Sequence, residues 1–492
     1  MPRPLVIGNG QLLVNFDDKL NIRDFYYPYV GLYNHLNGYK IRMGVWVENK
    51  FAWVDHEGWE RKLDYFDNTL VTNVVATNKE LQVTLHIRDA VYHHENAYLK
   101  EVIIENLSKK DREIRLFFTH DFRLGESDIG DTAFYDPYSD SVIHYKMHNY
   151  LLIGGSTGDH GIYEYATGIK GFLDFEGTWR DAEDGQLSMN SIAQGSVDST
   201  ISFRVQTKAS QKCPVQYWIV ADEDLVKVVE TNKRVMKRGF DDCLNSTAQY
   251  WEAWLGKAPP QLDTLPDNVA RLFKRSLLII RSQIDDRGAV IAANDSDIME
   301  TARAHYSYVW PRDGAFACYA LDQIGYPDIT RKFFRFCQGI LPKDHPMLMH
   351  KYHADGSMGA SWHPWIVHGQ PTIPFQEDGT ALVLWALRHH FDQNKDLEFL
   401  QSLYDDFVIP IADFLVKYRD KDTSLPLPSW DLWEERLGVN TFTAAAVWAG
   451  LISAQRIARV FGDNREKEYG LAAQEIKNGM LEHLWSEEHT RF

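Results

Sequence analysis

The residues best suited to chemistry lie together in one short segment, 430–436. Its sequence, Trp-Asp-Leu-Trp-Glu-Glu-Arg, contains two indoles, three carboxylates and a guanidinium. Indole faces stack on the apolar faces of sugars and exclude water. Exclusion of water raises the pKa of a carboxylic acid, which can then give its proton to a leaving oxygen near neutral pH. The segment therefore indicates acid catalysis on a carbohydrate, and the alternative is an acidic first turn of a helix.

Glu434 and Glu435 cannot be the acid and the base of one glycosidase site. Adjacent side chains point in different directions, whereas an inverting pair stands about 6.5–9.5 Å apart across the scissile bond. One of them is a candidate acid, and its partner must come from elsewhere. Arg436, which follows them, keeps a second carboxylate ionised for hydrogen bonds to hydroxyl groups.

A second candidate segment, 306–315, contains two tyrosines and Trp310, followed by Arg312 and Asp313. An Arg–Asp pair that opens a helix can hold vicinal hydroxyls, because one side chain donates and the other accepts. The alternative is a surface ion pair in which Asp313 caps a helix.

A third segment, 355–381, is a candidate pocket wall, with Trp362, His363 and Trp365 as lining residues. Glu377 and Asp378 open a further predicted helix, where helix capping explains them equally well. The acidic stretch 126–140 does not have the spacing of a calcium loop, so we expect no metal site.

Composition and charge exclude several classes of protein. The 492 residues are 44% hydrophobic and 25% charged, which is typical of a soluble globular protein and excludes disorder over most of the chain. The longest apolar run, 444–452, is far shorter than the ~20 residues that span a membrane. A net charge of −17 disfavours nucleic acids and anionic membranes as partners. Four cysteines without metal spacing and no secretory apolar stretch predict a cytoplasmic protein, and we expect no cofactor.

The hydrophobic period changes near residue 225. Before it, segments such as 83–88 and 201–206 alternate apolar and polar residues, and Asn-Gly and Asp-Gly turns separate them. After it the period is helical, with a connector over 224–255 and about seven further helices, at 267–285, 313–325, 327–339, 378–391, 396–419, 441–461 and 464–485. The pattern predicts an N-terminal antiparallel β-sandwich followed by an incomplete α/α toroid. The expected domains are a sandwich over 1–223, a helical linker over 224–266 and a partial (α/α)6 toroid over 267–492.

Three of these segments resemble motifs of glycoside hydrolase family 15, the glucoamylase and glucodextranase group. The matching blocks are Tyr308-Val-Trp-Pro-Arg-Asp313, Gln376-Glu-Asp-Gly-Thr-Ala-Leu382 and Asp431-Leu-Trp-Glu-Glu435. Residues 8–14 and 26–28 resemble the start of prokaryotic members, which carry a β-sandwich before the catalytic toroid. The resemblance implies an inverting exo-hydrolase that releases β-glucose from the non-reducing ends of α-glucans.

The resemblance also implies roles for individual residues. Glu434 matches the general acid, Glu435 a substrate-binding carboxylate and Trp433 a pocket residue. The expected substrate-binding residues are Tyr306, Trp310, Arg312, Asp313, Asp431, Trp433, Glu435 and Arg436. We expect the acid at position 434 to face a glucose-sized slot walled by the 306–313 segment. A tryptophan of fungal members falls near Thr372 here, so the chain departs from the family at that position.

A further departure concerns the second catalytic carboxylate. The family's toroid has twelve helices and its general base lies near the end of the domain, whereas we find about seven helices after residue 267 and no general base. The expectation is therefore a C-terminally truncated hydrolase with impaired activity. The alternatives are an α,α-trehalase, a non-hydrolytic α-glucan-binding protein, and a phosphorylase on the same plan.

Overall fold

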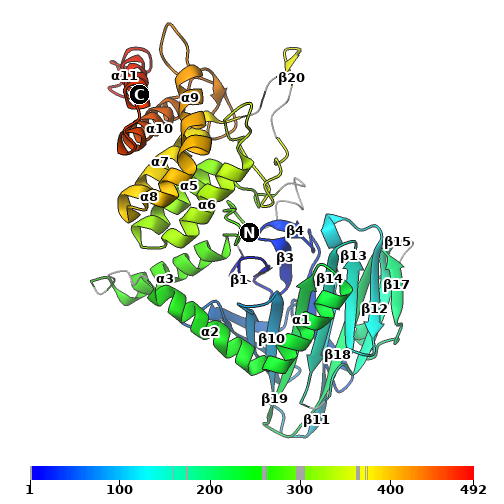
Figure 1. The fold of residues 1–492 in the computed structure, drawn as a ribbon. Coiled ribbons are helices and arrows are strands. Elements are labelled where there is room, and N and C mark those ends of the chain that lie inside the picture. Colours follow the sequence, from blue (N-terminus) through cyan, green and yellow to red (C-terminus); the bar gives the residue numbers. More distant parts are fainter. Residues whose placement is uncertain are drawn as a thin grey trace. The chain divides into compact units, whose positions relative to one another are not determined.

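The computed structural model describes residues 3–158, 160–172, 175–257, 262, 264–294, 305–361, 366–371, 373 and 375–492. It divides into two compact units (Figure 1). The first unit is Met1–Gln283 with Ala293–Ser307, and the second is Ile284–Ala292 with Tyr308–Phe492. The Trp362, His363 and Trp365 side chains and Thr372 lie outside the described residues.

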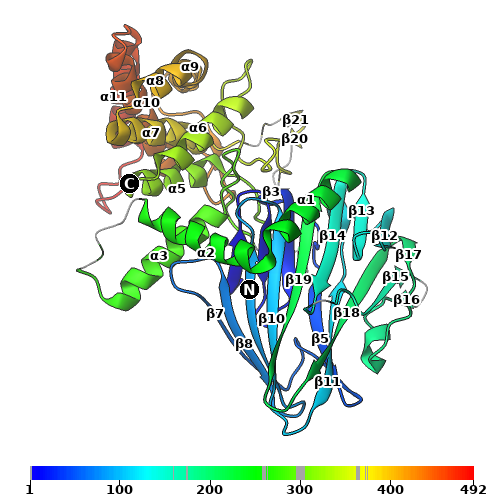
Figure 2. The same cartoon turned by 60° about the horizontal axis from the view of Figure 1, so that its bottom comes forward.

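The first unit is a sandwich of two antiparallel sheets, which in the described residues have ten and nine strands (Figure 2). The ten-stranded sheet consists of β1 (Leu5–Gly8), β2 (Leu13–Phe16), β3 (Ile22–Tyr29), β4 (Leu32–Asn34), β5 (Ile41–Val47), β6 (Lys50–Trp53), β11 (Arg112–His120), β15 (Glu164–Phe172), β16 (Phe175–Glu176) and β18 (Val197–Thr207). The nine-stranded sheet consists of β7 (Trp59–Tyr65), β8 (Thr72–Asn78), β9 (Val83–Val91), β10 (Ala97–Asn106), β12 (Asp131–Asp136), β13 (Ser141–Lys146), β14 (Asn149–Ser156), β17 (Ile192–Gly195) and β19 (Lys212–Asp222). Two 3₁₀ turns, η1 (Leu124–Glu126) and η2 (Asp181–Asp184), lie in the connections. The predicted sandwich is confirmed.

Aromatic side chains join the inner faces of the two sheets. Phe118 of β11 stacks on Tyr217 of β19 with ring centroids 4.2 Å apart, and both rings are buried. The alternation predicted for 201–206 is present over its second half, where Phe203 and Val205 are buried and Arg204 and Gln206 are exposed, whereas Ser202 is also buried. Burial of alternate residues is what fixes the register of a strand whose other face meets water.

The helices that the described residues of the first unit form are α1 (Leu225–Arg238), α2 (Phe240–Gly256) and α3 (Asp267–Ser282). Helix α1 covers β14 and β19, as Figure 2 shows, and the indole of Trp218 donates to Asn232 on the helix at 2.8 Å. The predicted connector is therefore helical, but it breaks at Gly239, whose φ of 95° is unfavourable for other residues.

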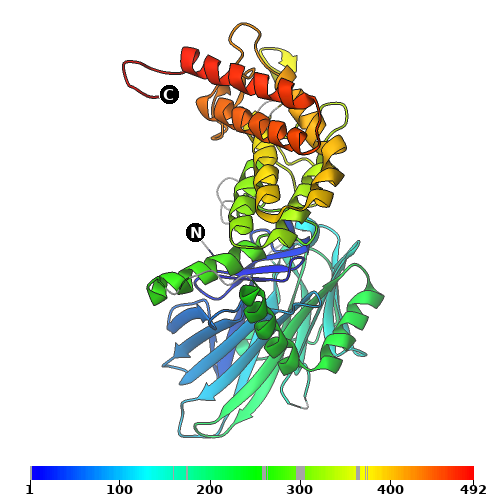
Figure 3. The same ribbon diagram turned by 60° about the vertical axis from the view of Figure 1, so that its left-hand side comes forward.

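The second unit is built from helical hairpins (Figure 3). Its described helices are α5 (Pro311–Gln323), α6 (Pro327–Ile340), α7 (Glu377–Asn394), α8 (Leu397–Leu403), α9 (Ile409–Lys417), α10 (Thr441–Val460) and α11 (Arg465–His483). Helix α7 packs against both α5 and α10 and is buried around most of its circumference. Apart from the segment 396–419, these positions match the predicted helices, including Pro327 in the first turn of α6 and a left-handed Gly462 after α10.

One predicted helix, 396–419, is wrong as a single element. The structure has α8, a π-helical turn η3 (Tyr404–Val408) and α9 instead. Pro410 lies in the first turn of α9, where it offers no backbone N–H and its ring crowds the preceding turn. Proline and single π turns are both recognised causes of a kink in a helix.

The long segments between these helices carry two small hairpins. Strands β20 (Ile366–Val367) and β21 (Gln370–Pro371) form one, and β22 (Ser429–Trp430) and β23 (Leu437–Gly438) form the other. Tyr352 forms single β-bridges with Val309 and with Met358. Among the described residues, no helix is long and apolar enough to cross a membrane.

Candidate active site

The β22–β23 hairpin presents the segment 431–436, and Asp431 organises its turn. The Asp431 carboxylate accepts backbone N–H groups of Glu435 at 2.8 Å and Arg436 at 3.3 Å. Its carbonyl accepts the N–H of Glu434 at 3.0 Å. Glu434 itself has a φ of 60°, a left-handed conformation that costs a residue with a β-carbon about 1–2 kcal/mol. The hairpin thus holds Glu434 in an unusual conformation through bonds to its neighbours.

Glu434 meets the other candidate segment through an indole. Trp310, which precedes the first residue of α5, is buried and donates its Nε1–H to Oε1 of Glu434 at 2.7 Å. The two segments expected to face each other are therefore in direct contact. The shielding indole is Trp310, whereas Trp433 in the acid's own segment is 75% exposed.

Arg312 links three parts of the second unit. Its Nη1 donates to Gln376 at 2.9 Å and to Asp378 at 3.1 Å, and Nη2 lies 3.5 Å from Asp313. Gln376 donates in turn to the carbonyl of Asp431 at 2.5 Å. The start of α5, the start of α7 and the 431–436 hairpin are therefore tied together by one hydrogen-bonded chain.

Asp313 is the accessible member of the predicted sugar-holding pair. The side chain of Asp313 is 44% exposed, compared with 13% for Arg312. Burial raises the pKa of Asp313, and the positive charge of Arg312 opposes that rise. Asp313 is thus placed to accept a hydrogen bond from a ligand, while Arg312 is engaged with protein groups.

Two acidic residues at the start of α7 are completely buried. Burial raises the pKa of Asp378, which the Arg312 charge opposes. Burial, and next the charge of Asp378, raise the pKa of Glu377 well above its usual value. Their burial favours an internal role for both residues over that of exposed helix caps.

The remaining predicted site residues are more exposed to solvent. Glu435 and Arg436 are exposed in the hairpin. Tyr306 is 41% exposed and belongs to the first unit, so its place beside a sugar stays a prediction. A hollow of about 420 Å³ opens at the base of the hairpin, lined by His345, Met347, Ile373, Phe375, Phe414, Tyr418, Pro428, Ser429, Trp430 and Leu437.

Sequence reasoning missed two residues of this site. Gln376 lies inside a motif block, but nothing in the block indicates that its amide bridges Arg312 to the hairpin. Lys351 lies in a long segment between α6 and α7, and its side chain is fully buried beside Tyr308 and Trp310. A lysine amid apolar and aromatic residues was the available signal, and it is weak because most lysines are exposed.

Comparison with known proteins identifies the helical part of the chain. The family model of Glycosyl hydrolases family 15 matches residues 269–491. An uncharacterized glycosyl hydrolase of Methanocaldococcus jannaschii is 26% identical over 497 residues, covering 99% of this chain and 75% of that protein. Residues 269–491 form a domain of glycosyl hydrolase family 15.

The chain is also similar to one further curated protein and to two solved structures. Trehalase 2 of Sulfolobus acidocaldarius is 26% identical over 251 residues, 46% of this chain and 41% of that protein. A bacterial glucoamylase solved with acarbose matches with a TM-score of 0.76 at 16% identity, over 97% of this chain and 66% of its own. A putative kojibiose phosphorylase from the human microbiome matches with a TM-score of 0.64 at 12% identity, over 99% of this chain and 68% of its own. The two structures show a shared fold, and the chain spans about two thirds of each.

Proposed function

We propose that the family 15 domain hydrolyses α-glucosidic bonds with inversion at the non-reducing ends of α-glucans, with Glu434 as the general acid. The observation that carries the proposal is the hydrogen bond from Trp310 to Glu434, which joins two independently found motifs. The hydrogen bond fixes the position of a partly buried carboxyl group, and a carboxyl group held in place is suited to transfer a proton to a leaving oxygen.

The proposed reaction moves one proton from Glu434 to the glycosidic oxygen as the C1–O bond breaks. Water adds to C1 from the opposite face and gives its proton to a second carboxylate. Asp431 does not suit that second role, because its carboxylate accepts two backbone N–H groups, and Glu435 is adjacent to the acid. The proposal therefore assigns the acid side of the reaction.

Recognition of the terminal glucose is proposed for Asp313, with Arg312 holding it in place. An exposed carboxylate oxygen accepts hydrogen bonds from sugar hydroxyls, and the neighbouring guanidinium keeps it oriented. The exposed Trp433 indole offers a flat apolar face against which a further sugar ring can stack.

The decisive experiment is hydrolysis by the purified chain. Maltose, isomaltose, dextran and trehalose are incubated separately, and the anomer of the first-formed glucose is followed by proton NMR. The expected result from maltose is an initial excess of β-glucose over the anomer mixture contributed by the reducing-end unit, with no requirement for phosphate. Newly formed glucose that is mainly α, beyond the share that the reducing-end unit of maltose contributes, contradicts inversion. Phosphate-dependent release of glucose 1-phosphate indicates a phosphorylase.

Addition of azide shows whether low activity is due to a missing general base or to a poor general acid. Azide attacks C1 without having to lose a proton, so it replaces water and base together. Azide cleavage of maltose yields one β-glucosyl azide and one glucose, the leaving group, for each bond broken. Formation of these two products in equal amounts, with little glucose in the absence of azide, would mean that the acid acts and that the base is not supplied. Binding of acarbose by calorimetry, with neither product, would instead support a non-hydrolytic α-glucan-binding protein.

An α,α-trehalase is the second candidate, because the chain is similar to Trehalase 2 of Sulfolobus acidocaldarius. Both substrates present an α-linked terminal glucose, so the acid at position 434 serves either reaction. Faster release of glucose from trehalose than from maltose selects this candidate.

A further inference from the structure

A buried lysine lies behind the candidate acid. Lys351 belongs to the segment between α6 and α7, and its side chain is fully buried. The backbone there is fixed by Tyr352, which exchanges two hydrogen bonds with Val309, at 2.8 and 2.9 Å. This bridge sets Lys351 beside the segment that carries Tyr308 and Trp310.

The ammonium group of Lys351 lies against two aromatic rings. Its Nζ is 4.6 Å from the ring centroid of Tyr308 and 5.5 Å from that of Trp310, both within the range of a cation–π interaction. Tyr308 and Trp310 meet edge to face, with centroids 5.9 Å apart and planes at 90°. The indole of Trp310 therefore lies near the lysine and donates its N–H to Glu434.

Glu434 and Lys351 also interact through their charges. Burial lowers the pKa of Lys351 to about 8, and the charge of Glu434 opposes part of that lowering. Glu434 faces Lys351 from the β22–β23 hairpin, Tyr308 faces it from the segment before α5, and His353 faces it from its own segment. Burial lowers the pKa of His353 below its usual value; the charge of Asp355 opposes this lowering, and the charge of Lys351 adds to it. The pKa of His353 therefore lies below that of Lys351.

We propose that Lys351 is a positioning residue for the acid: its ammonium holds the Trp310 indole that hydrogen-bonds Glu434 and stabilises the carboxylate left when Glu434 gives up its proton. The proton passes from Glu434 to the glycosidic oxygen as the C1–O bond breaks, and Lys351 keeps its own protons throughout. This inference rests on the proposed function. Because Lys351 is fully buried, it acts through Glu434 and Trp310 and does not contact a substrate.

The packing around the lysine supports a fixed position for it. A Cβ added at Gly359 would lie 2.9 Å from Cγ of Lys351 and 3.0 Å from Cδ1 of Tyr308. The Gly359 N–H donates to the Lys351 carbonyl at 3.1 Å. The backbone at Gly359 therefore packs directly against the aliphatic part of the Lys351 side chain, where a larger residue would not fit.

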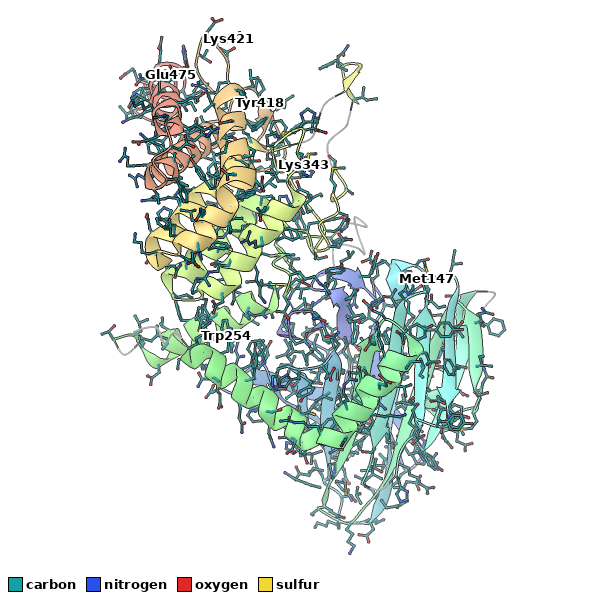
Figure 4. All side chains as sticks on the ribbon, in the orientation of Figure 1. Met147, Trp254, Lys343, Tyr418, Lys421 and Glu475 are labelled. Carbon is teal, nitrogen blue, oxygen red and sulfur yellow. The ribbon has the colours of Figure 1, made fainter. Side chains whose placement is uncertain are left out.

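The first test separates help with proton donation from general damage. Lys351→Met removes the charge and keeps the apolar stem, Lys351→Arg keeps the charge, and Lys421→Met at an exposed lysine labelled in Figure 4 is the matched control. Each is assayed on maltose and on α-glucosyl fluoride, whose fluoride leaves without needing a proton. We expect Lys351→Met to lower kcat on maltose about tenfold, a part of what a general acid contributes, with KM and fluoride hydrolysis within about twofold.

The same assays name the results that overturn the proposal. Equal losses on both substrates would mean that Lys351 only supports the fold. Unchanged maltose turnover in Lys351→Met would remove the lysine from the reaction. Lys351→Arg should recover most of the lost maltose turnover, and recovery no greater than that of Lys351→Met would also contradict the role of the charge.

A second measurement needs neither activity nor a folded Lys351 variant. The chain is labelled with 5-fluorotryptophan, and the ¹⁹F signal of residue 310, assigned with Trp310→Phe, is followed from pH 7 to pH 9. We expect that signal to shift with a midpoint near pH 8 in the parent chain, because the ammonium beside it loses its charge there. A signal that stays constant overturns the inference. A parent chain that cleaves neither substrate but shows the shift would remove the proposed function and leave the lysine–indole contact standing.

Discussion

Oε1 of Glu434 lies 2.7 Å from the indole nitrogen of Trp310, although 124 residues separate them in the sequence. Each belongs to a motif that has an ordinary structural explanation when considered alone. Because the two residues are hydrogen-bonded to each other, the two motifs are better explained as parts of one site than as two unrelated structural features. The N–H edge of the Trp310 indole holds the carboxyl group of the candidate acid, Glu434.

Removal of that hydrogen bond should slow the reaction while leaving the ring in place. Trp310→Phe keeps an aromatic ring against Lys351 and loses the N–H that Glu434 accepts. A hydrogen bond to a charged group contributes about 1.5–3 kcal/mol, so we expect kcat on maltose to fall about 10- to 100-fold. Trp485→Phe, at a partly buried indole that packs on Phe492, is the control and should leave the rate unchanged. A rate in Trp310→Phe equal to that of the control would show that the bond has no catalytic use.

Substitution of the acid itself should depend on the leaving group. Glu434→Gln is nearly isosteric but cannot donate the proton, so we expect maltose hydrolysis to fall about 100- to 10,000-fold while acarbose binding measured by calorimetry persists. α-Glucosyl fluoride should still be hydrolysed. The matched control is Glu475→Gln on α11, which removes the ion pair between Glu475 and Arg419 (Figure 4). Undiminished maltose turnover would remove Glu434 as the acid.

Most of the fold could be predicted from hydrophobic periodicity. Period-two segments before residue 225 and helical segments after it gave the sandwich and the hairpins, since burial of alternate faces is a local property of the sequence. The break at Pro410 was missed because the apolar pattern continues through it, and the π turn depends on how the widened backbone packs.

The candidate site was only partly predictable for a different reason. Glu434 and Arg312 stand in dense motifs, and their residue types alone indicate acid catalysis and hydroxyl binding. The sequence does not reveal that Arg312 is engaged by Gln376 and Asp378, nor that Lys351 packs beside Trp310. These contacts join segments far apart in the chain, so no local pattern records them.

Asp431 was expected to bind substrate, and its hydrogen bonds suggest a prediction that separates this role from loop support. Asp431→Ala removes the acceptor for the N–H groups of Glu435 and Arg436 and should let the turn at Glu434 relax. We expect kcat on maltose to fall and the melting temperature of the unit to drop by about 2–4 °C, which corresponds to about 1 kcal/mol. Asp431→Asn, which keeps one acceptor oxygen, should lose less of both. A large rise in KM with an unchanged melting temperature would instead support direct contact with the substrate.

Glu377 should make stability fall as pH rises, which is opposite to the behaviour of a salt-bridged acid. Within the described part of the chain neither carboxylate oxygen has a hydrogen-bond partner, and burial raises the pKa well above its usual value. The folded state therefore binds a proton that the unfolded chain releases near pH 4–5, so stability declines from there up to the folded-state pKa. Urea unfolding between pH 4 and pH 8 measures this slope.

Replacement of Glu377 by an apolar residue of similar length should abolish that slope. Glu377→Met removes the ionisable group, so we expect it to unfold at a higher urea concentration than the parent chain at pH 7 and at a similar concentration at pH 4. Glu398→Met, at an exposed acid on α8, controls for added hydrophobicity and should leave the pH dependence as it is in the parent chain. Lower stability of Glu377→Met at pH 7 would mean that the carboxylate is ionised and held by a favourable partner, contrary to the burial argument.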